Sequence, residues 1–337
     1  MKKTIHSPFS KRCVRVVQAG FTLVELMVAM AVGLLVVLAA LAALLVARSG
    51  FSNVDAASQL RDNGRFVSLL INRLAVQSGF KDFYAAAGPS DPDLPPAITG
   101  FSNAKVRTDE LERATPFRPT DPGYGSDVLI MRFQPAKLHP DTGEKLTDQA
   151  MIDCFGYAPK DIDGNTNQGV FFSAFSVGVD VTGEPTLMCT RSENGLAPYS
   201  TSSLVRGVEV FKVLYGVDSG VSPNAVPDPA ALLDTVTKRY LTADQMVVPG
   251  NEEATKENWR RVRSLRIGMV LRSDVTPGER ERLTFHPFGP AKSSAAGAVG
   301  SAFASTENVN STFNAPADGR IRQVVTFTVH LRNDQKG

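Results

Sequence analysis

The sequence contains few of the residues that build catalytic and metal centres. It has four histidines, three cysteines and one tryptophan in 337 residues. The histidines outside the first 20 residues, His139, His286 and His330, lie in unrelated sequence contexts. The chain lacks the Gly-x-Ser-x-Gly, His-Glu-x-x-His and phosphate-loop motifs, which are signatures of serine hydrolases, zinc proteases and nucleotide-binding enzymes. We therefore expect no catalytic residue, no metal, no cofactor and no enzymatic activity.

The body of the chain also lacks an excess of positive charge. The formal net charge is +2, but Lys2, Lys3, Lys11, Arg12 and Arg15 all lie in the first 20 residues, which contain no acidic residue. The rest of the chain therefore carries −3, and this balance argues against direct binding of nucleic acid. Because basic residues beside an apolar segment stay in the cytoplasm, the sequence places the chain beyond that segment on the far side of the membrane.

A long apolar run without proline follows these basic residues. Residues 26–47 contain no charged side chain. About 20 apolar residues span the hydrocarbon core of a bilayer, so the run predicts one transmembrane helix over residues 21–48. The alternative is an ordinary secretory signal, cleaved among the alanines after Leu38. The length of the run and the acidic Glu25 at its start both favour the transmembrane helix.

Glu25 is the most informative residue of this segment. A carboxylate at membrane depth costs roughly 2.5–3.5 kcal/mol on insertion scales, so it requires a partner. Cleavage after Gly20 would turn Phe21 into a new N-terminus, whose amine could pair with Glu25 of a neighbouring helix. Two unit charges about 4 Å apart attract by roughly 4 kcal/mol at an effective dielectric of about 20. The alternative is an acid that reaches the membrane interface and serves no assembly role.

Gly20, Phe21 and Glu25, in this spacing ahead of an apolar helix, resemble the prepilin signal of type IV pilins and type II secretion pseudopilins. The resemblance implies that a prepilin peptidase cleaves after Gly20 and methylates the amine of Phe21, and that Glu25 guides subunits into a helical filament. Two simpler interpretations remain open. Gly20 is then a plain glycine at a helix start, and Phe21 is only an apolar anchor.

A second resemblance covers much of the remaining chain. Residues 75–80, 204–218, 259–272 and 319–333 are similar to conserved blocks of minor pilins of the PilW type. The resemblance implies a subunit of the type IV pilus, with other minor and major pilins, the prepilin peptidase, the pilus assembly platform and inner-membrane lipid as partners, and with roles in adhesion, twitching motility or DNA uptake. The missing proline departs from major pilins, so Gly33 is the one soft point of the membrane helix.

These resemblances predict a minor pilin that takes part in assembly or priming of the type IV pilus. The protein would lie in the bacterial inner membrane as a single-pass protein, with its N-terminus cytoplasmic and its C-terminal domain periplasmic, and it would be incorporated into the pilus. One alternative is a pseudopilin at the tip of a type II secretion pseudopilus. Another is a membrane-anchored periplasmic binding protein or hydrolase.

The residue pattern beyond the membrane helix predicts an α+β fold of the type IV pilin kind, in which a long N-terminal helix packs on an antiparallel β-sheet domain. The domains expected are a cleaved leader over residues 1–20, the transmembrane helix, an amphipathic continuation over 49–79 and a β-rich head over 80–337. Asn63-Gly64 is a weak point of the helix, and Ser78-Gly79 ends it. Alternating apolar residues predict strands over 126–134, 170–177, 186–191, 204–216, 262–272 and 322–332.

Proline, glycine and small polar residues predict loops over 81–125 and 287–319. Within the second half, Trp259 is expected to be a core or strand-edge anchor. Residues 161–167 place oxygen side chains at every second position, as calcium loops do, but without the glycine and glutamate positions of an EF-hand. An Asx-rich turn is the other interpretation of this segment.

Cysteine usage points to an oxidised head domain. Cys13 leaves with the leader, and Cys154 and Cys189 remain on the exported side. An even pair in an oxidising compartment predicts a disulfide. Two buried free thiols are the alternative.

Overall fold

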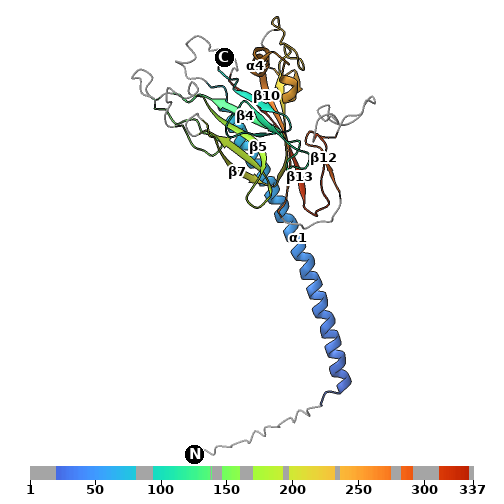
Figure 1. Ribbon diagram of the computed structural model, residues 1–337. Helices are drawn as coiled ribbons and strands as arrows, with labels where there is room; N and C mark the ends of the chain where they lie inside the picture. Colours follow the sequence, from blue (N-terminus) through green and yellow to red (C-terminus); the bar gives the residue numbers. More distant parts are fainter. Residues whose placement is uncertain are drawn as a thin grey trace, which may run out of the picture. The chain divides into compact units, whose positions relative to one another are not determined.

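The computed structural model describes residues 20–80, 94–136, 138, 146–159, 170–192, 197–231, 236–274, 282–290 and 311–333 (Figure 1). The chain divides into two units, Met1–Phe51 and Ser52–Gly337, and the division falls within the first helix. The basic leader up to residue 19, His139 and the possible calcium segment 161–167 lie outside the described residues. The domain limits at 20, 48 and 79 stay predictions.

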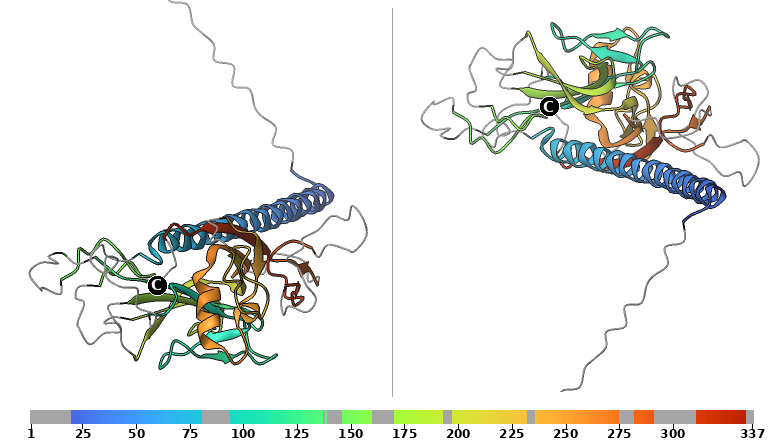
Figure 2. Two further views of the ribbon diagram at one scale, coloured as in Figure 1. Left: turned by 90° about the horizontal axis from the view of Figure 1, so that it is seen from above. Right: turned by 90° about the horizontal axis from the view of Figure 1, so that it is seen from below.

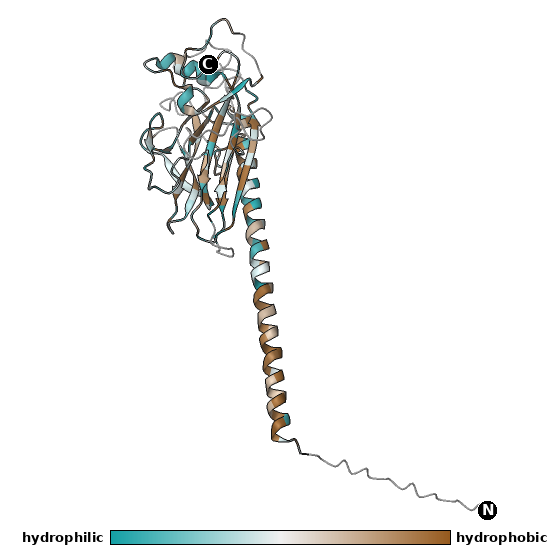
Figure 3. Cartoon of the chain, turned by 90° about the vertical axis from the view of Figure 1, so that its right-hand side faces the viewer, coloured by the Kyte–Doolittle hydropathy of each residue, from teal (hydrophilic) through white to brown (hydrophobic). Residues whose placement is uncertain are grey.

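The described part of the first unit is helical and apolar. Helix α1 (Leu23–Gln77) begins here, and every residue of α1 up to Phe51 is exposed. Leucine, alanine and methionine favour the helix, and proline, which would break it, is absent. Figure 3 shows the hydrophobic colour along this part of α1. By length and composition, α1 is the one helix among the described residues that could cross a membrane.

In the second unit, one face of α1 is buried. Leu60, Val67, Ile71 and Leu74 recur at helical spacing and are at most 3% exposed. The helix ends at Gln77 and is followed by Gly79 with a φ of +74°, the left-handed conformation that glycine adopts after a helix. The predicted helix end at Ser78-Gly79 is therefore confirmed.

The predicted weak point at Asn63-Gly64 is wrong, because α1 continues through it. Gly64 is buried and faces β13 (Arg322–His330). A Cβ atom at position 64 would lie 2.7 Å from Cγ2 of Val325. Figure 2 shows β13, in red, beside α1. The glycine thus allows a close approach of helix and strand.

The head contains two larger antiparallel sheets. The first has the order β1 (Ile98–Phe101), β4 (Val128–Phe133), β5 (Phe171–Val179), β6 (Pro185–Arg191) and β7 (Ser200–Arg206). The second has the order β13, β10 (Val262–Arg272), β8 (Val208–Val217) and β9 (Arg239–Leu241). The register of the second sheet places Met269 of β10 opposite Phe211 of β8 and Val325 of β13.

Smaller elements complete the head. Two short antiparallel pairs are β2 (Ala104–Val106) with β3 (Ala114–Pro116), and β11 (Thr284–Phe285) with β12 (Phe313–Asn314). The helices are α3 (Ala243–Met246) and α4 (Glu252–Arg260). Asn251 begins α4, because its side chain accepts a hydrogen bond from the N–H of Ala254.

One hydrophobic cluster joins the helix and both larger sheets. It contains Ile71 of α1, Phe175 and Leu187 of the first sheet, and Phe211 and Ile267 of the second. All five side chains are completely or almost completely buried. The predicted α+β fold, a long N-terminal helix with an antiparallel β domain, is confirmed.

Several sequence predictions need correction. The segment predicted as a loop over 81–125 contains β1, β2 and β3 within its described part. The loop predicted over 287–319 contains β12. The helices α3 and α4 and the strand β9 were not predicted, because short polar helices and a three-residue strand carry too little periodicity. Each of these elements depends on contacts with the larger sheets.

The single strand predicted over 204–216 is two strands that belong to different sheets. Gly207 separates β7 from β8 with a φ of +80°. Its N–H donates to the carbonyl of Pro185 at 2.7 Å, and its carbonyl accepts from the N–H of Arg272 at 2.7 Å. A Cβ atom here would lie 2.3 Å from the carbonyl oxygen of Arg272. Glycine therefore allows the chain to pass from one sheet to the other.

Replacing this glycine tests the crossover. We expect Gly207→Ala to destabilise the head by about 3 kcal/mol or more, because a left-handed φ costs roughly 1–2 kcal/mol and overpacking adds roughly 1–3 kcal/mol. Gly183 is the matched control, since its φ is +83° and nothing lies within 4 Å of its missing Cβ. Urea unfolding of both variants measures the difference. Equal losses for Gly183→Ala and Gly207→Ala would contradict the close contact.

A network of ion pairs connects the strands near this crossover. Glu209 of β8 accepts hydrogen bonds from Arg272 of β10 at 3.1 Å and from Nε of Arg322 of β13 at 2.6 Å. Arg272 also donates to Glu184 at 2.6 Å, and Arg322 donates to Asp318 at 2.7 Å. Most of these side chains are largely buried. Removing one partner would leave its neighbours uncompensated.

Asp318 lies at the partly exposed edge of this network, and its ionisation makes the stability of the fold depend on pH. Hydrogen bonds from Arg322 lower the pKa of Asp318 from 3.8 to about 2. This carboxylate stabilises the fold above its unfolded pKa, and the contribution disappears as the pH falls through the folded pKa. We expect Asp318→Asn to destabilise the head by about 1–2 kcal/mol at pH 7 and by little near pH 2.

Chemical denaturation at several pH values measures this dependence. The control is Asp55→Asn, which changes an exposed carboxylate on α1 and should leave stability unchanged between pH 7 and pH 2 relative to the wild type. A loss in Asp318→Asn that is the same at all pH values would show that packing, and not charge, holds Asp318 in place.

Candidate processing and assembly site

The residues that resemble a prepilin signal lie at the start of α1. Gly20, Phe21 and Thr22 precede the helix and are exposed, with Phe21 at 89%. Glu25 lies in the first helical turn and is exposed as well. An exposed segment without regular secondary structure, directly before a helix, is a form in which a protease can reach a peptide bond. The bond between Gly20 and Phe21 has this form.

Glu25 and Thr22 form a reciprocal cap at the helix start. The N–H of Thr22 donates to Oε2 of Glu25 at 2.9 Å, and the hydroxyl of Thr22 donates to the same oxygen at 3.0 Å. The N–H of Glu25 donates in turn to the hydroxyl of Thr22 at 3.3 Å. This arrangement is a capping box, in which two free backbone donors of the first turn are satisfied.

The cap leaves part of the carboxylate available. Both hydrogen bonds from Thr22 end on Oε2, and within the described residues Oε1 of Glu25 accepts none. Glu25 can therefore hold its own helix start and accept a cation from outside. The sequence analysis did not identify Thr22. The spacing Thr-x-x-Glu ahead of an apolar run is the signal that predicts it.

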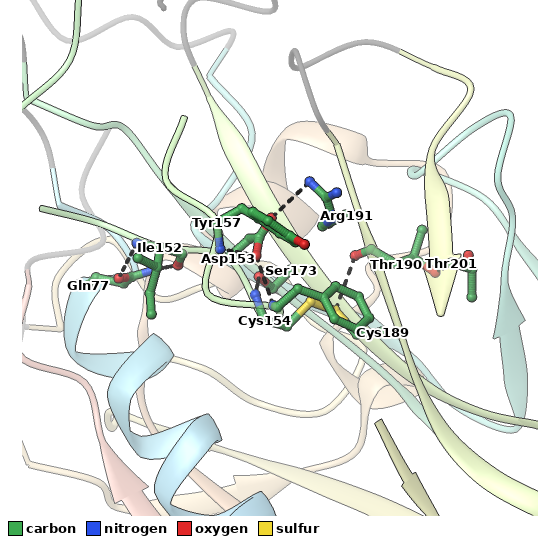
Figure 4. The surroundings of a disulfide bond; sticks show 11 residues. Gln77, Ile152, Asp153, Cys154, Tyr157, Ser173, Cys189, Thr190, Arg191 and Thr201 are labelled. Carbon is green, nitrogen blue, oxygen red and sulfur yellow. Dashed lines mark hydrogen bonds and ion pairs between the residues drawn. A yellow bond between two sulfur atoms is a disulfide. The ribbon is translucent and has the colours of Figure 1, made fainter. Parts of the chain in front are cut away.

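The cysteine pair belongs to the head. Cys154 and Cys189 form a disulfide with a Cα–Cα distance of 6.5 Å (Figure 4), as the sequence predicts. Both residues are buried in the main hydrophobic cluster. The bond links the segment 146–159 to β6. The loop-entropy model predicts that a disulfide closing a loop of this length stabilises the fold by about 3–4 kcal/mol. The alternative of free thiols is wrong for this structure.

The other singled-out residues have structural contacts. Trp259 lies on α4, is 5% exposed and meets the ring of Tyr215 edge-on, with centroids 4.7 Å apart. It is a core residue on a helix and does not lie at a strand edge. His286 lies 3.4 Å from the hydroxyl of Thr312, and His330 ends β13. Among the described residues, no group of three or more His, Cys, Asp or Glu side chains could hold a metal ion.

Two family models match the chain. The model of the type IV pilus-assembly protein W matches residues 174–333, nearly half of the chain. This range contains the blocks 204–218, 259–272 and 319–333, whereas the block 75–80 lies outside it. The model of the prokaryotic N-terminal methylation motif matches residues 15–41. That range contains Gly20, Phe21 and Glu25.

Comparisons with individual proteins add less. No curated protein matches the chain at a significant level. Among solved structures, a type IV-like pilin, TTHA1219 from Thermus thermophilus, is similar to this chain with 14% sequence identity and a TM-score of 0.38. The similarity covers 82% of this chain and 97% of that one.

The N-terminal methylation motif and the long apolar helix agree with an anchor in the inner membrane. The matched head region and the antiparallel fold agree with a structural subunit. The chain is similar to the type IV pilus-assembly protein W over residues 174–333, and residues 15–41 carry the prokaryotic N-terminal methylation motif.

Proposed function

We propose that this protein is a minor pilin that joins or primes a type IV pilus by packing its N-terminal helix into the filament. The observation that carries the proposal is the coexistence, in one chain, of the methylation motif over 15–41 and the pilus-assembly region over 174–333. The similarity to pilus-assembly proteins and the methylation motif support interaction with other pilins and processing by a prepilin peptidase. Which pilins lie beside this subunit is part of the proposal.

The mechanism begins with cleavage after Gly20, which gives Phe21 a free amine. The amine of one subunit then meets the carboxylate of Glu25 on the next, where Oε1 accepts no hydrogen bond within the described residues. The attraction of about 4 kcal/mol at 4 Å and an effective dielectric of about 20 offsets much of the cost of burying the two charges, of which the carboxylate alone accounts for roughly 2.5–3.5 kcal/mol. The pairing therefore favours assembly and fixes the axial register of neighbouring helices.

The topology follows from the charges of the leader. Five basic residues and no acid precede the apolar helix, so the leader stays in the cytoplasm and the head enters the periplasm. The Cys154–Cys189 disulfide supports this orientation, because disulfides persist in oxidising compartments. The inner membrane holds the subunit until the assembly platform extracts it.

A type II secretion pseudopilin shares the processing motif and is the second candidate. The match to the pilus-assembly protein W over residues 174–333 favours the pilus. Genes for other minor pilins beside this one would support the pilus, and a secretion operon would support the pseudopilus. A membrane-anchored periplasmic binding protein or hydrolase is the third candidate, and it requires no role for Glu25 in assembly.

The role of Glu25 is tested by replacement. We expect Glu25→Ala to insert normally into the membrane but to reduce surface pili by about tenfold or more, because its removal eliminates an interaction of several kcal/mol between subunits. Counting surface pili and measuring the membrane-bound protein separates assembly from insertion. The control is Glu252→Ala on α4, which changes an exposed acid of the head. A wild-type number of surface pili in Glu25→Ala would contradict the proposed role of Glu25 in filament assembly.

Processing gives a prediction about the mature chain. We expect intact-mass analysis of the membrane fraction to find a protein that begins at Phe21 and carries one methyl group on its amine. In Gly20→Leu, the leader should remain attached, because a bulky side chain replaces glycine at the cleaved bond. A wild-type chain that begins at Met1, or one cleaved near residue 40, would rule out processing at Gly20.

A further inference from the structure

The C-terminal end of α1 is held by three separate segments of the head. The N–H of Gly79 donates to the carbonyl of Arg132 at the end of β4 at 3.0 Å. The side-chain amide of Asn333, which follows β13, donates to the carbonyls of Val76 and Ser78 at 2.9 Å each. Carbonyls in the last turn of a helix lack partners within the helix, and these contacts satisfy two of them.

The third contact comes from the segment that carries the disulfide. The side-chain amide of Gln77 donates to the carbonyl of Ile152, and its oxygen accepts from the N–H of Ile152 at 3.3 Å (Figure 4). A single side chain thus pairs with both polar groups of one backbone residue. We call this pairing the Gln77–Ile152 clamp. It joins the last residue of α1 to a segment 75 positions further along the chain.

The clamp lies two residues from the disulfide. Cys154 is bonded to Cys189 of β6, and its N–H donates to the hydroxyl of Ser173 on β5 at 3.0 Å. Asp153 forms an ion pair with Arg191 at 3.2 Å. These contacts place Ile152 opposite Gln77. The disulfide is the only covalent one among them.

We propose that the Cys154–Cys189 disulfide acts as a redox-dependent lock, which holds the Gln77–Ile152 clamp closed and thereby fixes the C-terminal end of α1 to the head. The covalent bond restricts the conformations of the segment around Ile152. Less conformational entropy is therefore lost when Ile152 pairs with Gln77. Without the bond, the three hydrogen bonds and the ion pair named above must order the segment, and each of them contributes only modestly to stability. The lock does not depend on the function proposed above, because it concerns only contacts within the head.

The chemistry of the lock is thiol–disulfide exchange. In the forward direction, the two thiols of Cys154 and Cys189 lose two protons and two electrons, and a disulfide oxidant accepts the electrons and becomes a dithiol. In reverse, a dithiol such as dithiothreitol attacks the disulfide as its thiolate, the bond between the two sulfur atoms breaks, and the reagent is oxidised to its own cyclic disulfide. Both sulfur atoms are buried, so reduction requires the segment around Cys154 to open.

Amide hydrogen exchange of the full chain in detergent tests the lock. We expect the N–H groups of Ser78, Gly79 and Phe80 to exchange about tenfold faster in Cys154→Ser/Cys189→Ser than in the oxidised wild type, because the clamp opens more often. The N–H groups of α4 should be unchanged, which shows that the head is still folded. The oxidised variant Gln77→Ala should give the same increase, and its effect should vanish in the disulfide-free background.

The matched control is Gln59→Ala, which removes a glutamine from the exposed side of the same helix and should leave exchange at residues 78–80 unchanged. The lock is overturned if the helix end exchanges equally fast with and without the disulfide, or if Gln77→Ala has its full effect in both backgrounds. If the N–H groups of α4 exchange faster in the cysteine variant, that variant is not properly folded. The rate at which dithiothreitol reduces the oxidised proteins is then measured instead. Gln77→Ala must then be reduced about tenfold faster than Gln59→Ala, and equal rates overturn the lock.

Discussion

The face of α1 formed by Leu60, Val67, Ile71 and Leu74 is buried in the cluster that also holds residues of both larger sheets. Each sheet has an apolar face that must be covered, and the helix and the other sheet together cover it. The close contact of Gly64 with Val325 brings α1 near enough to β13 for this burial. The remaining features of the head keep these three layers in place.

Paired charged groups connect the strands of the head. Glu209, Arg272 and Arg322 connect β8, β10 and β13, and Lys212 lies 2.6 Å from Asp127 with both side chains almost completely buried. Such groups are tolerated inside a protein only when they are paired and hydrogen-bonded. These charges of the head are therefore paired with one another, whereas Glu25 keeps one carboxylate oxygen without a hydrogen bond among the described residues. This contrast supports the assembly role proposed for Glu25.

Sequence reasoning worked where a residue pattern is long or chemically unusual. The end of α1 at Ser78-Gly79 and the strand β10 over Val262–Arg272 agree closely with the predicted limits, because helical and alternating periodicities extend over many residues there. It failed where one continuous pattern crosses from one sheet to the other. The strand predicted over 204–216 has alternating residues throughout, and only the pairing of β7 with β6 and of β8 with β10 reveals a break at Gly207.

The sequence by itself determined the long apolar helix, the methylation motif that contains Gly20 and Phe21, the acid Glu25, the pairing of Cys154 with Cys189 and the α+β class, since charge, hydropathy and spacing are local properties of the chain. Only the tertiary structure decided that Gly64 and Gly207 are points of close backbone approach, and that Gln77 contacts Ile152 beside the disulfide. These contacts join residues far apart in sequence, and their geometry depends on how helix and sheets pack together, which no local pattern specifies.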